Sequence, residues 1–225
     1  LKQTYLTKQG WQLESPRVFI LLKKLRAAGT PLGEYVNGHF YYGIKTGYNQ
    51  AFVIDRATHD ALIEEHASSA EILKPFLRGR DVKRWRIEFA GQYLIKIESS
   101  ENKKHPWTGK SDKQAEKIFS ETYPAVYNYF SQFRKQLIKR YDQGKYFWEL
   151  RSCAYWNEFN SPKLIYPDLA DSCKFAFDSD RFIGDCTVFV VPHTSQYLTG
   201  ILNSRIIGSF GIDMGKSCCT GGYRE

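Results

Sequence analysis

Apolar residues recur along the chain at two spacings, which predict helices and strands in an irregular order. Helical spacing and capping residues predict four helices. The first begins at Ser15 and Pro16 and ends at Gly29. The second runs over residues 55–66, capped by Asp55 or Thr58, and the third is one long helix over 122–140. The fourth covers 195–207 and is capped by Ser195. The apolar positions of this long element share one face and are expected in the core: Val126, Phe130, Phe133 and Leu137.

Shorter apolar stretches predict strands. They cover residues 40–44, 51–54, 93–97, 163–166, 174–177 and 187–191, whereas the polar residues 99–113 predict a loop. The first two strands are separated by a short turn that contains Gly47. Because strands and helices are mixed without a regular βαβ order, the pattern favours an α+β fold over a doubly wound one.

The composition adds a core and a charge to this picture. Hydrophobic residues make up 42% and aromatic residues 16% of the 225 positions, which is enough for a folded interior and excludes disorder. The formal net charge of +8 suits a polyanionic partner, and nucleic acid is the commonest one. A mildly basic protein without such a partner is the alternative.

The sequence contains no self-contained catalytic motif. It lacks both the GxGxxG pattern of dinucleotide-binding loops and the GxxxxGK[ST] phosphate loop. Five cysteines without a CxxC pair, and scattered histidines, argue against zinc and favour a reducing, cytoplasmic compartment. No apolar run approaches the roughly 20 residues that cross a membrane. Asp168, Asp171 and Lys174 weakly suggest a metal-dependent nuclease, but their spacing favours a turn.

The strongest positive signal is the segment RGRDVKRWR at 78–86, here called the basic segment. It combines a tryptophan, Trp85, with five basic residues, Arg78, Arg80, Lys83, Arg84 and Arg86. Guanidinium groups bind phosphate and can also recognise guanine, and an interleaved aromatic ring can stack on a base. A solvated basic loop whose tryptophan packs into the core is an equally good interpretation.

Two further segments are candidates for DNA contact. In GIKTGYNQAFVID at 43–55, a glycine-bounded turn carries Lys45, Thr46 and Asn49, which suit contacts to base edges or phosphates. The alternative is a hairpin whose polar side chains bond only their own backbone. In YFWELRSCAYW at 146–156, aromatic residues surround Arg151, although Phe147 and Trp148 are expected in the core.

These motifs occur in an order that resembles a known family. The order consists of GIKTGYNQAFVID at 43–55, ILKPFLRGRDVKRW at 72–85, YFWELRSCAYWNEFNSPKLIYPD at 146–168, ILNSRI at 201–206 and a closing GGY. It resembles the TaqI-like C-terminal specificity domain of Eco57I-type and type IIG restriction–modification adenine methyltransferases. The resemblance covers the chain from about Pro31. It predicts a helical lead-in over residues 1–30 and a DNA target-recognition domain over 31–225.

The resemblance also implies a division of labour. In that family an N-terminal domain binds S-adenosylmethionine and methylates adenine N6, and the C-terminal domain grips DNA so that the target base can be flipped out. We therefore expect double-stranded DNA and a catalytic methyltransferase domain of the same polypeptide as partners, with no cofactor or catalytic residue in this segment and no membrane contact. Whether the parent enzyme also carries an endonuclease is left open.

The family fold implied by the resemblance has irregular, β-rich layers with interspersed helices, followed by a helical hairpin. The predicted helix over 195–207 would begin that hairpin. Two alternatives to DNA recognition are an RNA-binding module and a protein-interaction module with an incidental basic loop. The same charge and aromatic residues suit RNA as well as DNA, and the basic segment alone does not establish that any nucleic acid binds.

Overall fold

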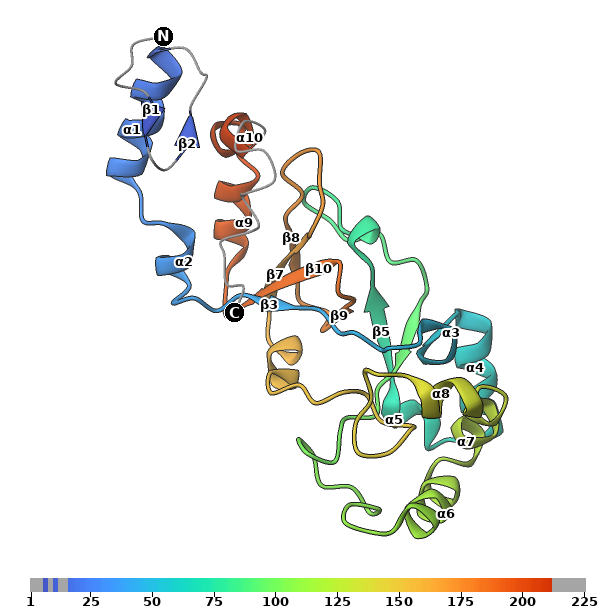
Figure 1. The fold of residues 1–225 in the computed structure, drawn as a ribbon. Helices are drawn as coiled ribbons and strands as arrows, with labels where there is room; N and C mark the ends of the chain where they lie inside the picture. Colours follow the sequence, from blue (N-terminus) through green and yellow to red (C-terminus); the bar gives the residue numbers. More distant parts are fainter. Residues whose placement is uncertain (1–5, 8–9, 12–15, 212–225) are drawn as a thin grey trace.

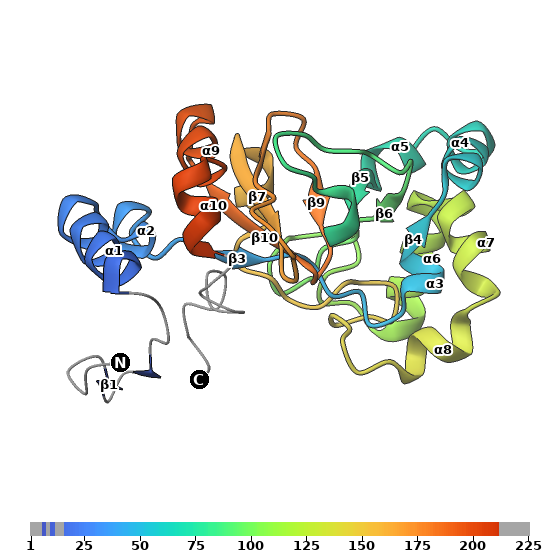
Figure 2. The same ribbon diagram turned by 90° about the horizontal axis from the view of Figure 1, so that it is seen from above.

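The computed structural model describes residues 6–7, 10–11 and 16–211 and has a mixed α+β architecture. Two four-stranded sheets lie in the middle of the molecule, with helices at both ends (Figures 1 and 2). The predicted α+β class is therefore confirmed. Within the described ranges, every helix is too short or too polar to span a bilayer.

The first sheet is antiparallel throughout, with the strand order β3-β10-β7-β8. Its strands are β3 (Tyr41–Tyr42), β7 (Lys163–Pro167), β8 (Ala176–Asp178) and β10 (Val188–Pro192). Every residue of β7 and β10 is buried, because both faces of this sheet are covered. Leu164 of β7 packs with Leu198 of α9 (Gln196–Leu202) on one face, whereas its neighbour Ile165 packs into the main core on the other.

The second sheet has the order β4-β6-β5-β9. Its strands are β4 (Val53–Ile54), β5 (Leu73–Leu77), β6 (Tyr93–Ile95) and β9 (Ile183–Gly184). Strand β6 is antiparallel to both of its neighbours, while β5 and β9 run parallel. The turn after β9, residues 185–187, leads directly into β10 of the first sheet and so connects the two sheets.

Helices gather at the two ends of the molecule, as Figure 2 shows. At one end lie α1 (Pro16–Ala28), α2 (Leu32–Tyr35), α9 and α10 (Arg205–Gly211). At the other end lie α3 (Asn49–Phe52), α4 (Arg56–Glu65), α5 (Ser69–Ile72), α6 (Asp112–Thr122), α7 (Pro124–Ser131) and α8 (Arg134–Lys139). The short 3-10 turns η2 (Gly79–Asp81) and η3 (Trp156–Asn160) complete the fold.

The prediction of one long helix over 122–140 is wrong. The segment instead forms two helices: α7, which begins at Pro124 and ends at Ser131, and α8, which begins at Arg134. Between them the Phe133 N–H donates to the Phe130 carbonyl at 2.9 Å, a bond to the third preceding residue that ends the regular helix. Pro124 has no N–H to continue a helix, so it also separates α7 from α6, and Tyr123 has φ −130° and ψ 64°. The predicted apolar face is nevertheless in the core, since Val126, Phe130 and Leu137 are buried.

The predicted strand over 51–54 is also wrong in its first half, because residues 49–52 form the single helical turn α3. The segment before it does not form a hairpin with it: β3 pairs with β10, and β4 pairs with β6. Likewise the predicted helix over 195–207 ends at Leu202, where Asn203 turns its side chain to bond the backbone of Phe175. The helix α10 follows after this break.

Candidate nucleic-acid interface

Two of the three predicted segments lie against one turn, residues 185–187. The Gly43 N–H donates to Val188 O at 2.9 Å. From the basic segment, the Gly79 N–H donates to Thr187 Oγ1 at 2.8 Å, and the Asp185 N–H donates to the Leu77 carbonyl at 2.8 Å. The turn therefore holds the starts of both segments in fixed positions.

Glycine is required at both contacts by the close approach of the backbones. A Cβ on Gly43 would lie 1.9 Å from the carbonyl oxygen of Asp185, and a Cβ on Gly79 would lie 2.8 Å from that of Thr187. No side chain fits at the first distance, and the second is tighter than real Cβ contacts. The glycines of the two motifs thus serve the packing of the segments onto the turn.

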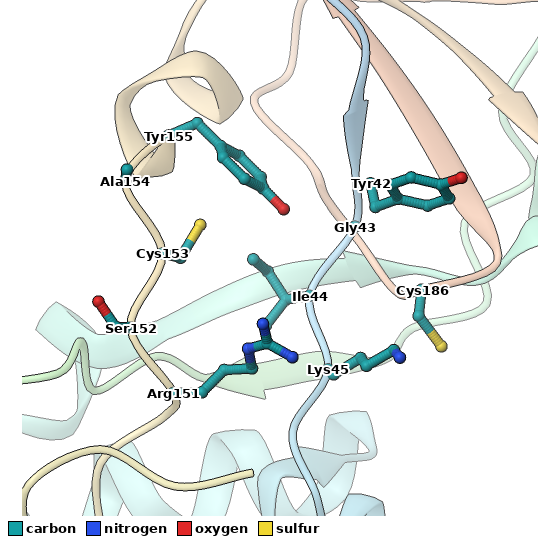
Figure 3. Close-up of a pocket in the computed structure, with 10 residues that line it drawn as sticks. All are labelled: Tyr42, Gly43, Ile44, Lys45, Arg151, Ser152, Cys153, Ala154, Tyr155 and Cys186. Carbon is teal, nitrogen blue, oxygen red and sulfur yellow. The ribbon is translucent and has the colours of Figure 1, made fainter. Parts of the chain in front are cut away.

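On one side of the turn is a pocket of about 470 Å³, here called the Lys45 pocket (Figure 3). It brings together two predicted residues, Lys45 and Arg151, from segments that are far apart in the sequence. Figure 3 shows the Arg151 side chain pointing toward the backbone of Ile44 and Lys45. The remaining lining residues are Tyr42, Gly43, Ile44, Ser152, Cys153, Ala154, Tyr155 and Cys186.

The two basic residues of the Lys45 pocket differ in their partners. Arg151 Nη1 lies 3.2 Å from Asp142 Oδ1, so its charge is partly neutralised. Lys45 is exposed and makes no hydrogen bond or ion pair with any described residue. Burial raises the pKa of Tyr155, at the back of this pocket, to about 12, so its hydroxyl stays protonated.

On the other side of the turn is a pocket of about 540 Å³, here called the Arg78 pocket. Four basic side chains line it: Arg78, Arg80, Lys83 and Lys174. Two carboxylates, Asp168 and Asp185, lie among them, together with Gly79, Val82, Pro167, Leu169 and Thr187. Asp185 Oδ1 accepts the backbone N–H of Thr187 at 2.8 Å, so this carboxylate closes the turn itself.

The five bases of the basic segment fall into two groups. Arg84 donates to the carbonyl oxygen of Asn203 at 2.5 Å, Arg86 Nε donates to Glu88 Oε1 at 2.9 Å, and Lys83 lies 3.9 Å from Glu88. Arg78 and Arg80 have no ion pair or side-chain hydrogen bond with a described residue. Within the described residues, only this second group of the segment's bases therefore lacks a direct partner, although Asp168 and Asp185 line the same pocket. Trp85 lies between the paired arginines and is 54% exposed.

In the segment 43–49, the polar residues are mostly engaged within the protein. Thr46 is only 2% exposed, and its hydroxyl donates to Asn49 Oδ1 at 2.5 Å and accepts the Tyr48 N–H at 3.1 Å. The buried guanidinium of Arg140 donates to the Thr46 carbonyl at 2.6 Å, and burial lowers the pKa of Arg140 to about 10. Asn49 is exposed, so its amide faces solvent while Thr46 holds it from behind.

Most of the aromatic segment 146–156 is core, as predicted for Trp148. Glu149 is fully buried and accepts from Trp107 Nε1 at 2.9 Å, which ties this segment to the loop before α6. Only Arg151 and its neighbours reach the Lys45 pocket.

The structure brings the suspected nuclease residues near one another. Lys174 pairs with Asp171 at 2.7 Å, and it lines the Arg78 pocket together with Asp168. Across the described ranges, no group of three or more His, Cys, Asp or Glu side chains is placed to hold a metal ion. Sequence reasoning missed the turn 185–187 and the position of Lys174, because neither belongs to a recognisable motif.

Comparison with known proteins places this chain in a class. The model of the TaqI-like C-terminal specificity domain family matches residues 74–217, which is more than half of the chain. The chain therefore belongs to this family and is a specificity, or target-recognition, domain. Residues 31–73, which the resemblance also included, lie outside the matched range, and the domain boundary near residue 31 stays a prediction.

One solved structure similar to the chain is that of the type IIL restriction–modification enzyme MmeI in complex with DNA. The identity is 13% and the TM-score 0.45, over 73% of this chain and 20% of the MmeI chain. The present chain thus corresponds to about a fifth of that enzyme's length. No curated protein matches the sequence.

Proposed function

We propose that this chain binds double-stranded DNA as the target-recognition part of a restriction–modification adenine-N6 methyltransferase. The observation that carries the proposal is the turn 185–187, which holds two basic pockets side by side. Unpaired cations from two distant segments, Lys45 on one side and Arg78 and Arg80 on the other, are thereby fixed on the same part of the molecule. Family membership and the net charge of +8 support the same partner.

In this proposal the unpaired cations bind phosphates. Arg78, Arg80 and Lys45 have no carboxylate partner, so DNA phosphates can neutralise them without breaking an internal contact. Arg84 and Arg86 bond groups of the protein and instead hold the basic segment in shape. Arg151 and Lys83 have weaker partners, so they are expected to contribute less.

Asn49 is the proposed base-recognising residue. An asparagine amide can donate to and accept from adenine in the major groove, which requires that the amide be held in one orientation. The hydrogen bond from Thr46 supplies that restraint, because the buried hydroxyl occupies Asn49 Oδ1 and leaves the amide NH₂ outward. Thr46 thus acts through Asn49 rather than by touching DNA.

Methyl transfer is assigned to a separate methyltransferase domain of the parent polypeptide, which supplies S-adenosylmethionine as methyl donor. The residues described here do not fit that cofactor. Both pockets are lined by ammonium and guanidinium groups, which disfavour a sulfonium cation. We expect that incubation of the chain with DNA, Mg²⁺ and S-adenosylmethionine leaves the DNA unmethylated and uncut; turnover would contradict the assignment.

The central test is the salt dependence of binding. Labelled duplex DNA titrated with the chain should bind in the non-specific range, with Kd about 10⁻⁴–10⁻⁶ M at physiological salt. Arg78→Gln and Arg80→Gln should each lower the slope of log K against log salt by about one, as expected for a lost phosphate contact. Arg86→Gln is the matched control, because this arginine is paired with Glu88, and it should leave the slope unchanged.

Binding that ignores salt would refute the proposal, as would equal slopes for all three variants. Competition with a hairpin RNA distinguishes the RNA alternative. An RNA-binding module would release duplex DNA at equimolar hairpin, whereas a DNA-recognition domain would retain it.

A further inference from the structure

Trp85 differs from the other tryptophans whose side chains are described. Trp107, Trp148 and Trp156 are at most 4% exposed, whereas Trp85 is 54% exposed. A single exposed apolar residue is common in proteins, so exposure alone does not indicate a role. The backbone of Trp85 supplies the second observation.

Trp85 has φ +76°, in the left-handed region that bulky side chains rarely adopt. Such a conformation persists only where the surroundings enforce it, and it is concentrated at functional sites. Here the Lys83 N–H bonds the Arg86 carbonyl at 2.9 Å across a tight turn, and the Trp85 N–H bonds the carbonyl of Phe175 at 3.0 Å. The backbone of Trp85 is thereby fixed at the tip of the turn, where its side chain is more than half exposed.

Phe175, whose carbonyl accepts the Trp85 N–H, is itself held through both its N–H and its carbonyl. Asn203, at the end of α9, bonds Phe175 twice: its Oδ1 accepts the Phe175 N–H at 3.1 Å, and its Nδ2 donates to the Phe175 carbonyl at 2.7 Å. The Asn203 carbonyl then accepts from Arg84, whose guanidinium lies 5.5 Å from the centre of the Trp85 ring. Contacts of five residues, Lys83, Arg84, Arg86, Phe175 and Asn203, thus surround a strained conformation that carries an exposed indole.

We propose that Trp85 stacks on a base at an opened step of the duplex. This inference rests on the proposed function and deepens it by giving Trp85 a distinct chemistry: π-stacking on an unpaired base, not contact with the phosphates. Sequence-tolerant stacking on aromatic residues, and wedging between bases, are general means by which proteins bind distorted DNA. A family that requires access to a single base provides a use for it.

The surroundings favour nucleic acid over a protein partner for this indole. Lys83, Arg84 and Arg86 flank it, with Glu88 as the paired carboxylate. A protein surface covering Trp85 would have to desolvate these charges together with their partners, whereas a single base stacked on the indole covers the ring and leaves them in solvent. If the indole only bound another protein, the affinity of the chain for DNA would be the same for an intact and an opened duplex.

The experiment compares two duplexes of one sequence, one intact and one carrying 2-aminopurine opposite an abasic site. The 225-residue chain is expected to bind the opened duplex more tightly and to quench 2-aminopurine fluorescence. Trp85→Gly should weaken binding to the opened duplex about 5- to 150-fold and abolish the quenching, while binding to the intact duplex changes little. Trp85→Phe, which keeps a ring, should retain part of both.

The stability of the glycine variant separates stacking from a structural role. Glycine adopts positive φ without strain, so Trp85→Gly should melt no lower than the original chain. A lower melting temperature would mean that the indole stabilises the fold, and unchanged quenching would mean that it does not stack; either result overturns the inference. Loss of salt-dependent binding to both duplexes in the original chain would instead refute the proposed function itself.

Discussion

The segment 43–49 and the basic segment 78–86 meet the same turn in the same way, yet they use their polar residues differently. Each carries a glycine at or near its start, Gly43 or Gly79, that packs on the backbone of residues 185–187. In the first segment Thr46 is buried and bonds the exposed Asn49, and Lys45 is left as the free cation. In the basic segment the first two arginines are free, and the later ones are bonded to Glu88 and Asn203.

The difference shows that nearby carboxylates and carbonyls decide which polar residues remain available to a ligand. The Thr46 carbonyl lies beside the buried Arg140, and the interior must satisfy both groups. Arg86 is two residues from Glu88, within easy reach of its carboxylate. Arg78 and Arg80 make no ion pair with a described residue, although Asp168 and Asp185 line the same pocket. The number of polar residues in a motif is therefore the largest number of groups that it can offer to a ligand, and internal bonds reduce that number.

The largest effect is expected from filling the space that Gly43 leaves. Gly43→Ala places a Cβ 1.9 Å from a backbone oxygen, which cannot move without disrupting the bridge between Ile44 and Asp185. We expect a loss of about 4 kcal/mol in the free energy of unfolding, measured by urea denaturation. Gly200→Ala in α9 is the control, since nothing lies within 4 Å of its Cβ, and it should stabilise the chain by about 0.5–1 kcal/mol. Similar values for the two would show that the turn is not a rigid support.

A smaller loss is expected when the support of the segment 43–49 is removed from the other side. Arg140→Met removes the side-chain donor to the carbonyls of Thr46, Phe147 and Glu149, of which Glu149 keeps the Gly144 N–H at 3.3 Å. Since an unsatisfied buried acceptor costs about 1–3 kcal/mol, we expect a loss of about 3 kcal/mol, partly offset by relief of the buried charge. Lys139→Met, on the exposed end of α8, should stay within about 0.5 kcal/mol. A neutral Arg140→Met would mean that the segment holds its shape unaided.

The sequence predicted elements whose signals are local. The cap of α4 is an example: Asp55 precedes the helix and accepts the Thr58 N–H at 2.8 Å, as its position in the sequence suggested. Central strands such as β7 and β10 were predicted by their continuous apolar runs. Strand β5 was not, because Pro75 argues against a strand and only its pairing with β6 and β9 reveals it.

For the candidate site, the sequence predicted which kinds of residue are present, but not which of them are bonded within the protein and which are free. The cluster of bases at 78–86 follows from the sequence alone, but the close approach of Gly43 and Gly79 to the turn 185–187 was not predicted. The hairpin that was the alternative interpretation of residues 43–55 does not form, because β3 pairs with β10, more than 140 residues later, and no local pattern encodes such a pairing. For the same reason the partner of Arg84, Asn203, could not be predicted.

The hydrogen bond between Thr46 and Asn49 gives a third, smaller effect. Thr46→Val keeps the shape of the side chain and removes the hydroxyl, so we expect a loss of about 1 kcal/mol in unfolding free energy. Combined with Asn49→Ala in a double-mutant cycle, the two should be coupled by at least about 0.5 kcal/mol. Additive losses would show that the hydroxyl does not restrain the amide, and Asn49 would then lack the fixed orientation that base recognition needs.

The smallest effect on stability, and the sharpest test of the comparison, comes from the two cations of the Lys45 pocket. Lys45→Gln and Arg151→Gln should each leave the unfolding free energy within about 0.5 kcal/mol, because both side chains are exposed and a surface ion pair contributes little. Their effects on DNA binding should differ. Lys45 is unpaired, so its loss should lower the salt slope by about one, whereas Arg151 is already paired with Asp142 and its loss should lower the slope by less.

The measurement is a titration of one labelled duplex at four salt concentrations for the two variants and the original chain. If Arg151→Gln has the larger effect, DNA must displace Asp142 from the arginine, and internal pairing would no longer predict which cations bind phosphate. Asp142→Asn separates that outcome, because freeing Arg151 should then strengthen binding.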